Sequence, residues 1–154
     1  MKLAQAHVAV TGAGSGLGQA VAERLASEGA KVTVIDRNAK AAQTVASATG
    51  GHPLALDVTD EAAGDALDRA IAAQGPLRGL VNCAGIGGAQ RIMGREGPMP
   101  LEVFERTIRV NLIGTFNMLR LCAARMQANA PQDGERGVIV NTASVAASDG
   151  QLGQ

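Results

Sequence analysis

A cluster of closely spaced glycines follows an apolar run near the start of the chain, and this arrangement restricts the fold more than any other feature. Residues 7–11 form the run, and Gly12, Gly16 and Gly18 come directly after it. A helical pattern begins in the same segment, because apolar residues recur at every fourth position: Leu17, Val21 and Leu25. A tight turn into a helix leaves amides without partners, and these can bind a phosphate. The segment therefore predicts a strand, a phosphate-binding turn and a helix.

Short apolar runs and helical patterns alternate through the rest of the chain. Five strands are predicted, each with the apolar composition of a buried parallel strand: His7–Thr11, Lys31–Asp36, Leu54–Val58, Gly79–Asn82 and Gly137–Asn141. The helices between them are expected to end at Gly29, to cover Ala39–Ala48, to extend from an N-cap at Thr59 to Gly75, and to run from Pro100 to about Ala128. Strands joined in this way form a parallel sheet with helices on both faces. We therefore predict a single α/β domain over residues 1–154, a doubly wound parallel sheet (Rossmann) truncated after its fifth strand.

The last predicted helix has an apolar face at spacing four, made by Phe104, Ile108, Leu112 and Phe116. A kink at Gly114 is considered, because glycine weakens a helix interior. The glycine-rich segment 86–99 precedes this helix and is predicted to be a loop that contacts substrate.

Composition disfavours several classes of protein. Apolar residues make up 46% of the chain and charged residues 18%, without a long apolar run, so disordered and membrane-spanning chains are disfavoured. The 14 basic residues balance 14 acidic ones and no basic block occurs, so no nucleic-acid or membrane partner is expected. The expected partner is a small-molecule substrate.

The cysteines and the N-terminal residues favour a cytoplasmic protein without a metal site. Cys83 and Cys122 are far apart and form no CxxC motif, and the two histidines form no ligand pair with them. About five residues precede the first predicted strand, which is too few for a signal or transit peptide.

Asp36 ends the second predicted strand, 18 residues after Gly18, where a carboxylate can reach the ribose of a bound adenosine. A 2′-phosphate within about 4 Å would be repelled by about 4 kcal/mol per charge pair at intermediate dielectric. These residues favour NAD over NADP as the cofactor, although the neighbouring Arg37 could soften that preference. The alternative is an aspartate that only closes a turn at the end of the strand.

The ordered motifs of the chain resemble those of the short-chain dehydrogenase/reductase family. Residues 11–18 have the family's glycine spacing, Thr-Gly-xxx-Gly-x-Gly, and Asp57-Val58 stands where that pair contacts the adenine ring. Asn82-Cys83-Ala84-Gly85 is similar to the Asn-Asn-Ala-Gly motif, with Cys in second place. Asn111 and Ser144 lie in segments similar to those that carry the family's catalytic Asn and Ser.

The resemblance implies a cofactor site and part of a catalytic site. NAD would be bound by Gly12, Ser15, Gly16, Leu17, Gly18, Asp36, Asp57, Val58, Asn82, Cys83, Ala84 and Gly85. Ser144 would polarise the substrate oxygen, and Asn111 would anchor a water of the proton relay. Simpler roles stay open: Asp57 could cap its turn, Cys83 could be a small buried residue, Asn111 could bond helix backbone, and Ser144 could be a loop hydroxyl.

Within the family, residues 141–154 look most like the type 2 3-hydroxyacyl-CoA dehydrogenases. This likeness implies hydride transfer between NAD and a secondary alcohol such as a 3-hydroxyacyl-CoA, with hydroxysteroids as another substrate class. It also implies that full-length relatives are homo-oligomers.

The sequence contains no tyrosine, whereas proton transfer in the family depends on a Tyr-xxx-Lys motif after the catalytic Ser. We expect the chain alone to be inactive, since a positioned acid or base contributes about 10²- to 10⁴-fold. We also expect uncovered apolar helix faces and an uncovered fifth strand, which favour association. A non-catalytic dinucleotide-binding module stays open as an alternative. Another phosphate-binding class is disfavoured, because the loop lacks the Gly-Lys-Ser/Thr of a P-loop.

Overall fold

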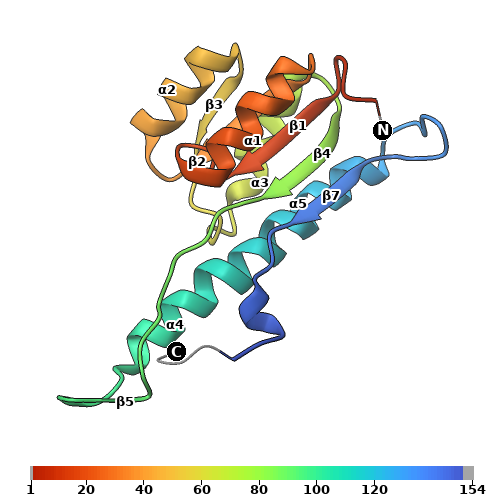
Figure 1. Ribbon diagram of the computed structural model, residues 1–154. Helices are drawn as coiled ribbons and strands as arrows, with labels where there is room; N and C mark the ends of the chain where they lie inside the picture. The colour runs from red at the N-terminus through yellow and green to blue at the C-terminus, as the bar shows by residue number, and fades with distance from the viewer. Residues whose placement is uncertain (1, 151–154) are drawn as a thin grey trace.

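Five parallel strands form the centre of the computed structural model, which describes residues 2–150 (Figure 1). Their order across the sheet is β3 (His52–Ala55), β2 (Lys31–Asp36), β1 (His7–Thr11), β4 (Leu77–Asn82) and β7 (Val138–Asn141). The principal helices are α1 (Gly16–Ser27), α2 (Ala39–Thr49), α3 (Ala63–Gln74), α4 (Leu101–Ile108) and α5 (Thr115–Gln127). The predicted α/β class and parallel sheet are confirmed. Part of the resemblance noted above rests on residues 151–154, which lie outside the described residues.

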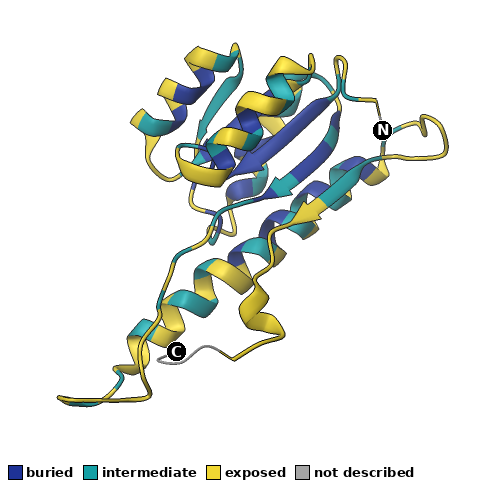
Figure 2. Cartoon of the chain, viewed as in Figure 1, coloured by how far each residue is buried: buried dark blue, intermediate teal, exposed yellow. Residues whose placement is uncertain are grey.

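Helices cover both faces of the sheet. Alternate side chains of each strand point to opposite sides, so apolar side chains are buried on both faces. Val8 and Val10 of β1 pack with the buried residues of α1 and α2. Ala9, between them, packs on the other face with the buried residues of α3 and α5. Figure 2 shows the resulting core, with β1 and β4 buried along most of their length. The strand order reverses between β1 and β4, which places a topological switch point there.

Strand β3 begins and ends earlier than predicted. The sequence pattern indicated Leu54–Val58, whereas the strand spans His52–Ala55. Its last residue lies opposite Asp36, the last residue of β2. Because β2 ends there, the apolar residues that follow have no strand to pair with. Asp57 and Val58 therefore lie in the turn after β3 rather than at its end.

Helix α3 begins at Ala63 and has no side-chain cap, so the predicted N-cap at Thr59 is wrong. The Thr59 hydroxyl instead donates to Asp57 Oδ1 at 2.8 Å, and the Thr59 N–H donates to the same oxygen at 2.8 Å. Asp60 Oδ1 accepts from the N–H of Ala62 at 2.9 Å. The two aspartates therefore shape the turns that precede the helix, and Asp57 does cap its turn.

One continuous helical segment contains α4, a π turn η1 (Arg109–Gly114) and α5 (Figure 1). Gly114 has helical φ and ψ of −62° and −45°, so it does not kink the helix. A Cβ at this position would lie 2.5 Å from Val58 Cγ2. Gly114 therefore serves close packing of the helix against the turn after β3. No helix among the described residues combines the length and apolar composition needed to span a membrane.

The apolar face predicted for this segment is largely exposed. Phe104, Leu112 and Phe116 each have more than half of their surface exposed. The residues of α5 that pack against α3 and the sheet are instead Met118, Cys122 and Met126. The side of α4, η1 and α5 that carries Phe104, Leu112 and Phe116 thus has no covering element within residues 2–150, as expected from the sequence.

The segment 86–99, predicted to be a loop, also contains a short antiparallel pair. Strands β5 (Met93–Gly94) and β6 (Gly97–Pro98) form it. The pair projects past the start of α4, far from the five-stranded sheet (Figure 1).

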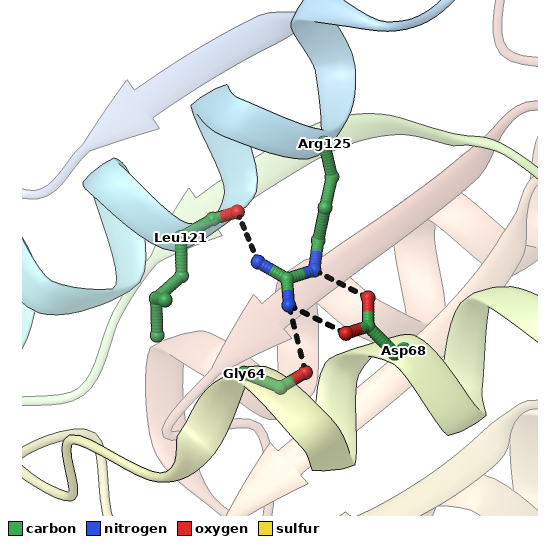
Figure 3. A network of polar contacts seen from close by, with 4 residues as sticks. All are labelled: Gly64, Asp68, Leu121 and Arg125. Carbon is green, nitrogen blue, oxygen red and sulfur yellow. Dashed lines mark hydrogen bonds and ion pairs between the residues drawn. The ribbon is translucent and has the colours of Figure 1, made fainter.

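Arg125 joins α5 to α3 through a bidentate ion pair (Figure 3). Its Nε and Nη2 donate to the two carboxylate oxygens of Asp68 at 2.7 and 2.8 Å. The same guanidinium donates to the carbonyls of Gly64 and Leu121 at 2.9 and 2.8 Å. The hydrogen bonds from Arg125 lower the pKa of Asp68. The Arg125 side chain is 21% exposed and that of Asp68 is 60% exposed, so the pair lies at the surface on its Asp68 side and is anchored by the partly buried guanidinium.

Replacing Arg125 with Met should lower the free energy of unfolding by about 1 to 2 kcal/mol, because four hydrogen bonds from a largely buried group are lost. Arg24→Met is the matched control, since Arg24 pairs with Glu28 one turn away on the exposed side of α1. The control should lose less than about 0.5 kcal/mol. Urea unfolding followed by far-UV circular dichroism measures both variants. Equal losses would contradict a stabilising role for the link between α3 and α5.

His7 is buried in β1, and both of its ring nitrogens are bonded. Nδ1 lies 2.8 Å from the Gly75 carbonyl oxygen and Nε2 lies 2.8 Å from Thr33 Oγ1. Because a carbonyl can only accept, Nδ1 carries the proton, and the Thr33 hydroxyl donates to Nε2. Burial lowers the pKa of His7 despite the Gly75 contact, which raises it. The folded protein therefore favours the neutral ring.

The free energy of unfolding should decline as the pH falls through about 6.5, the usual histidine pKa. Below that value the unfolded chain binds a proton that the folded chain takes up only at lower pH, so the full contribution of His7 is present above it. His7→Gln should flatten this decline. His52→Gln, at a partly exposed histidine, should change the decline much less than His7→Gln, because its charge is only a lesser cause of the lowered His7 pKa. Urea unfolding at several pH values measures the slope, and an unchanged slope in His7→Gln would contradict the assignment.

Candidate functional site

A pocket of about 390 Å³ opens at the carboxyl ends of β1, β2 and β4. Its lining includes every residue predicted to bind the cofactor except Asn82: Gly12, Ser15, Gly16, Leu17, Gly18, Asp36, Asp57, Val58, Cys83, Ala84 and Gly85. Sequence reasoning missed five further lining residues: Ile35, Arg37, Leu56, Ile86 and Val110. Each of the five lies next to a predicted site residue, since Val110 precedes Asn111. Proximity along the chain was their only signal, except for Arg37, whose charge was considered in the choice between NAD and NADP. The volume is within the usual range for small-molecule sites, about 300–1,000 Å³.

The glycine turn brings α1 unusually close to β1. A Cβ at Gly18 would collide with the Gly12 carbonyl, and one at Gly12 would lie 2.7 Å from Ala84 Cα. Gly12 and Gly16 have positive φ values of 63° and 54°, but a Cβ at Gly16 would meet no atom within 4 Å. Gly12 and Gly18 therefore serve close contact within the protein, whereas Gly16 faces open space.

The N-terminus of α1 is not capped by a side chain. Ser15 stands at the N-cap and makes no side-chain capping bond, and no acidic residue lies in the first turn. Helix α2 differs, because Asn38 Oδ1 accepts from the N–H of Ala41 at 3.1 Å. The first amides of α1 and the positive end of its dipole are thus available to an anion in the pocket. Leu17 is 72% exposed in this turn and lines the pocket, so it does not belong to the core face of the helix.

Thr11, the last residue of β1, ties this strand to the loop after β4. Its Oγ1 accepts hydrogen bonds from the N–H groups of Cys83 and Ala84, both at 3.1 Å. The bonds fix the Cys83–Gly85 wall of the pocket. Thr11 belongs to the glycine motif but was not assigned a site role from the sequence. Its role depends on the pairing of β1 with β4, where Thr11 lies opposite Asn82.

Asp36 lies across the pocket opening and bonds two backbone amides. Its Oδ2 accepts from Gly14 at 3.0 Å, and its Oδ1 accepts from Asn38 at 2.9 Å. The bond from Asn38 closes a turn at the end of β2, so Asp36 also has the simpler role that the sequence left open. A carboxylate has about four lone-pair sites, so these two bonds leave acceptors for ligand hydroxyls.

Asp57 and Cys83 lie on further parts of the pocket wall. The backbone and side-chain bonds from Thr59 lower the pKa of Asp57, so this carboxylate is held in its charged form. Cys83 is only partly buried and packs at the edge of the core. Its Sγ lies 3.8 Å from the Thr142 hydroxyl oxygen, and it lines the pocket. Cys122, in the core, is the buried thiol, and burial raises its pKa to about 12.

Asn82 lies behind the pocket wall rather than on it. Its Nδ2 donates to Asn141 Oδ1 at 2.9 Å, and its carbonyl accepts from the Thr142 hydroxyl at 2.8 Å. Asn82 therefore connects β4 to the end of β7 and to the segment that leads to Ser144.

Asn111 and Ser144, the two predicted catalytic residues, do not line the pocket. Asn111 lies in η1, and its side chain makes two hydrogen bonds with the backbone of Ile86. Its Oδ1 accepts from the Ile86 N–H at 2.8 Å, and its Nδ2 donates to the Ile86 carbonyl at 2.9 Å. Its side chain thus bonds a loop and not the helix itself. Ser144 is the N-cap of the short 3₁₀ helix η2 (Val145–Ala147), and its Oγ accepts from the Ala146 N–H at 3.2 Å. That bond uses a lone pair, so the hydroxyl can still donate.

A family model described as short chain dehydrogenase matches residues 6–154 of the chain. Among similar proteins, 3-hydroxyacyl-CoA dehydrogenase type-2 of Drosophila melanogaster is 48% identical over 151 residues. The alignment covers 94% of this chain and 59% of that relative, so the chain spans about three fifths of the relative's length.

Two solved structures are similar over almost the whole chain. One is 3-hydroxyacyl-CoA dehydrogenase type-2 from Mycobacterium avium, with a TM-score of 0.88, 37% identity, and coverage of 100% of this chain and 63% of that chain. The other is a 7α-hydroxysteroid dehydrogenase complexed with NADH and 7-oxo glycochenodeoxycholic acid. It has a TM-score of 0.83, 32% identity, and coverage of 99% of this chain and 58% of that chain. The family match and the NADH complex together indicate a dinucleotide cofactor.

Thr11→Val should lower the free energy of unfolding by about 1 to 3 kcal/mol, because two partly buried amides lose their acceptor while side-chain shape is kept. Thr44→Val is the matched control on α2, where the exposed hydroxyl only donates back to the Lys40 carbonyl. The control should change stability by less than about 0.5 kcal/mol. Far-UV circular dichroism during urea unfolding is the suitable readout, since the chain has no Trp or Tyr. A Thr11→Val protein as stable as the control would contradict the role given to Thr11.

Proposed function

The chain belongs to the short-chain dehydrogenase family, and from this premise we propose that it forms the NAD-binding part of an oxidoreductase. The reaction would be hydride transfer between NAD and a secondary alcohol such as a 3-hydroxyacyl-CoA. The observation that carries the proposal is one pocket lined by both the uncapped N-terminus of α1 and the Asp36 carboxylate.

The residues of the pocket fit the parts of a dinucleotide. The free amides from Ser15 to Gly18 would bind the pyrophosphate, because they combine unpaired N–H groups with the positive end of a helix dipole. Asp36 would accept hydrogen bonds from the hydroxyls of the adenosine ribose. Asp57 and Val58 would lie along the adenine, and Cys83–Gly85 would lie along the opposite wall.

Asp36 also favours NAD over NADP. A 2′-phosphate would approach the Asp36 carboxylate, which the two backbone amides hold in place. Arg37 lines the same pocket and would offset part of the repulsion. The glycine turn, residues 12–18, contains no Lys or Arg that could bind a second phosphate group.

Ser144 and Asn111 would serve the reaction from the side of the pocket opposite Asp36. Bound NAD supplies the hydride acceptor. The Ser144 hydroxyl would donate to the substrate oxygen, since its existing bond to Ala146 leaves the proton free. Asn111 would hold Ile86, and through it the loop that forms part of the pocket wall. Asn111 would also anchor a water of the proton relay. The 154 residues include no tyrosine that could take the substrate proton.

A 3-hydroxyacyl-CoA is the proposed substrate because the similar proteins of highest identity include a dehydrogenase named for that substrate. Hydroxysteroids are a second substrate class, supported by the structure solved with a bile-acid ligand. A dinucleotide-binding module without catalysis is the alternative that the lack of tyrosine favours. Turnover of a 3-hydroxyacyl-CoA by the chain separates an enzyme from such a module.

The protein should bind NAD at least about tenfold more tightly than NADP, because the Asp36 carboxylate repels the extra phosphate. Asp36→Asn should reduce this ratio, mainly through tighter binding of NADP. Isothermal titration calorimetry gives both dissociation constants. Equal affinity of the unaltered protein for the two cofactors would contradict the preference for NAD, and no binding of either at millimolar concentration would contradict the site itself.

A further inference from the structure

We propose that Asp36 is also a positioning residue, which holds the glycine turn in the shape that binds phosphate. The predicted effect on ligand binding rests on the proposed function, which supplies the ligand. The contact between Asp36 and the glycine turn is independent of the proposed function. The inference therefore concerns how the turn is held, in addition to what Asp36 recognises in the ribose.

The hydrogen bond from Gly14 to Asp36 connects the middle of the turn to the end of β2. The Gly14 N–H donates to Asp36 Oδ2 at 3.0 Å. Asn38 donates to Oδ1 at 2.9 Å and so fixes the orientation of the carboxylate. The neighbouring Ala13 N–H donates to the Ile35 carbonyl at 3.0 Å. Two successive amides of the turn are therefore held by two successive residues of β2.

The packing around Gly14 fits this contact closely. A Cβ at Gly14 would lie 2.7 Å from Ala41 Cβ and 2.8 Å from Asp36 Oδ2. A side chain there would push the carboxylate away or separate the turn from α2. The turn therefore has little room to shift while the bond to Asp36 is present. The next residues along the chain carry the free amides of α1.

Holding the turn is compatible with binding a ribose. Each carboxylate oxygen accepts one backbone N–H in the structure, which leaves the remaining lone pairs for two hydroxyls. Loss of Asp36 should then weaken two parts of the site. Ribose recognition is lost directly, and the pyrophosphate site is loosened through Gly14.

The sign of the effect on a phosphate ligand distinguishes this role from ribose recognition alone. A carboxylate beside the pocket repels an anion, so its removal should strengthen anion binding if charge is all that matters. If Asp36 holds the turn, its removal should weaken anion binding instead. Inorganic pyrophosphate is the suitable probe, because it has no ribose and no base.

Asp36→Ala should bind pyrophosphate at least about threefold more weakly than the unaltered protein, which corresponds to about 0.6 kcal/mol. Asp65→Ala is the matched control: it removes an exposed carboxylate in the first turn of α3 that does not line the pocket. The control should bind pyrophosphate as tightly as the unaltered protein or more tightly. Titrations followed by nuclear magnetic resonance measure these affinities. Equal or stronger binding by Asp36→Ala would overturn the proposal.

Exchange of the Gly14 amide proton with solvent tests the contact without any ligand. We expect this proton to be protected in the unaltered protein and to exchange at least about tenfold faster in Asp36→Ala, but not in Asp65→Ala. Exchange at the rate of an unstructured amide in the unaltered protein would overturn the proposal, even if Asp36→Ala fails to fold. Protection of Gly14 in a protein that binds no NAD would instead contradict the proposed function and leave the contact established.

Discussion

Close contact between α1 and the turn after β1 is the constraint on which the rest of the site depends. No side chain separates Gly18 from the Gly12 carbonyl, so the helix begins directly over the end of the strand. This contact directs the uncapped first turn of α1 toward the ends of β2 and β4. If α1 began one side chain farther away, its amides would no longer share a pocket with Asp36 and Ala84.

Polar side chains at the strand ends hold the pocket together. Thr11 bonds the loop after β4, Asp36 bonds the turn after β1, and Asn82 bonds the end of β7. Each residue contacts backbone or side-chain groups that belong to another strand's end. Asp36, which lines the pocket, therefore also fixes the geometry of its wall, and Thr11 and Asn82 support that wall from behind.

The sequence predicted the fold well where local patterns decide it. Strands β1 and β2 were predicted with the observed bounds, because each is a buried run that ends where the chain turns. The end of β3 depends on where β2 ends, which the pattern of β3 itself does not contain. The face with Phe104 and Phe116 has helical spacing, but spacing alone cannot say which element covers a face.

The same limit applies to the site. The glycines, Asp36 and the Cys83–Gly85 segment could be grouped from the sequence because they follow strands of one parallel sheet. The hydrogen bonds between Asn111 and Ile86 could not be predicted from the sequence, since they join residues 25 positions apart through a π turn.

The π turn also affects how the helix can vary among relatives. A π turn accommodates one extra residue within a helix, so Arg109–Gly114 is a point where a single-residue insertion or deletion can be absorbed while both α4 and α5 stay in place. When related helices are aligned, the spacing of apolar residues in α4 and the spacing in α5 should therefore be compared separately, without assuming one continuous helical repeat across the π turn.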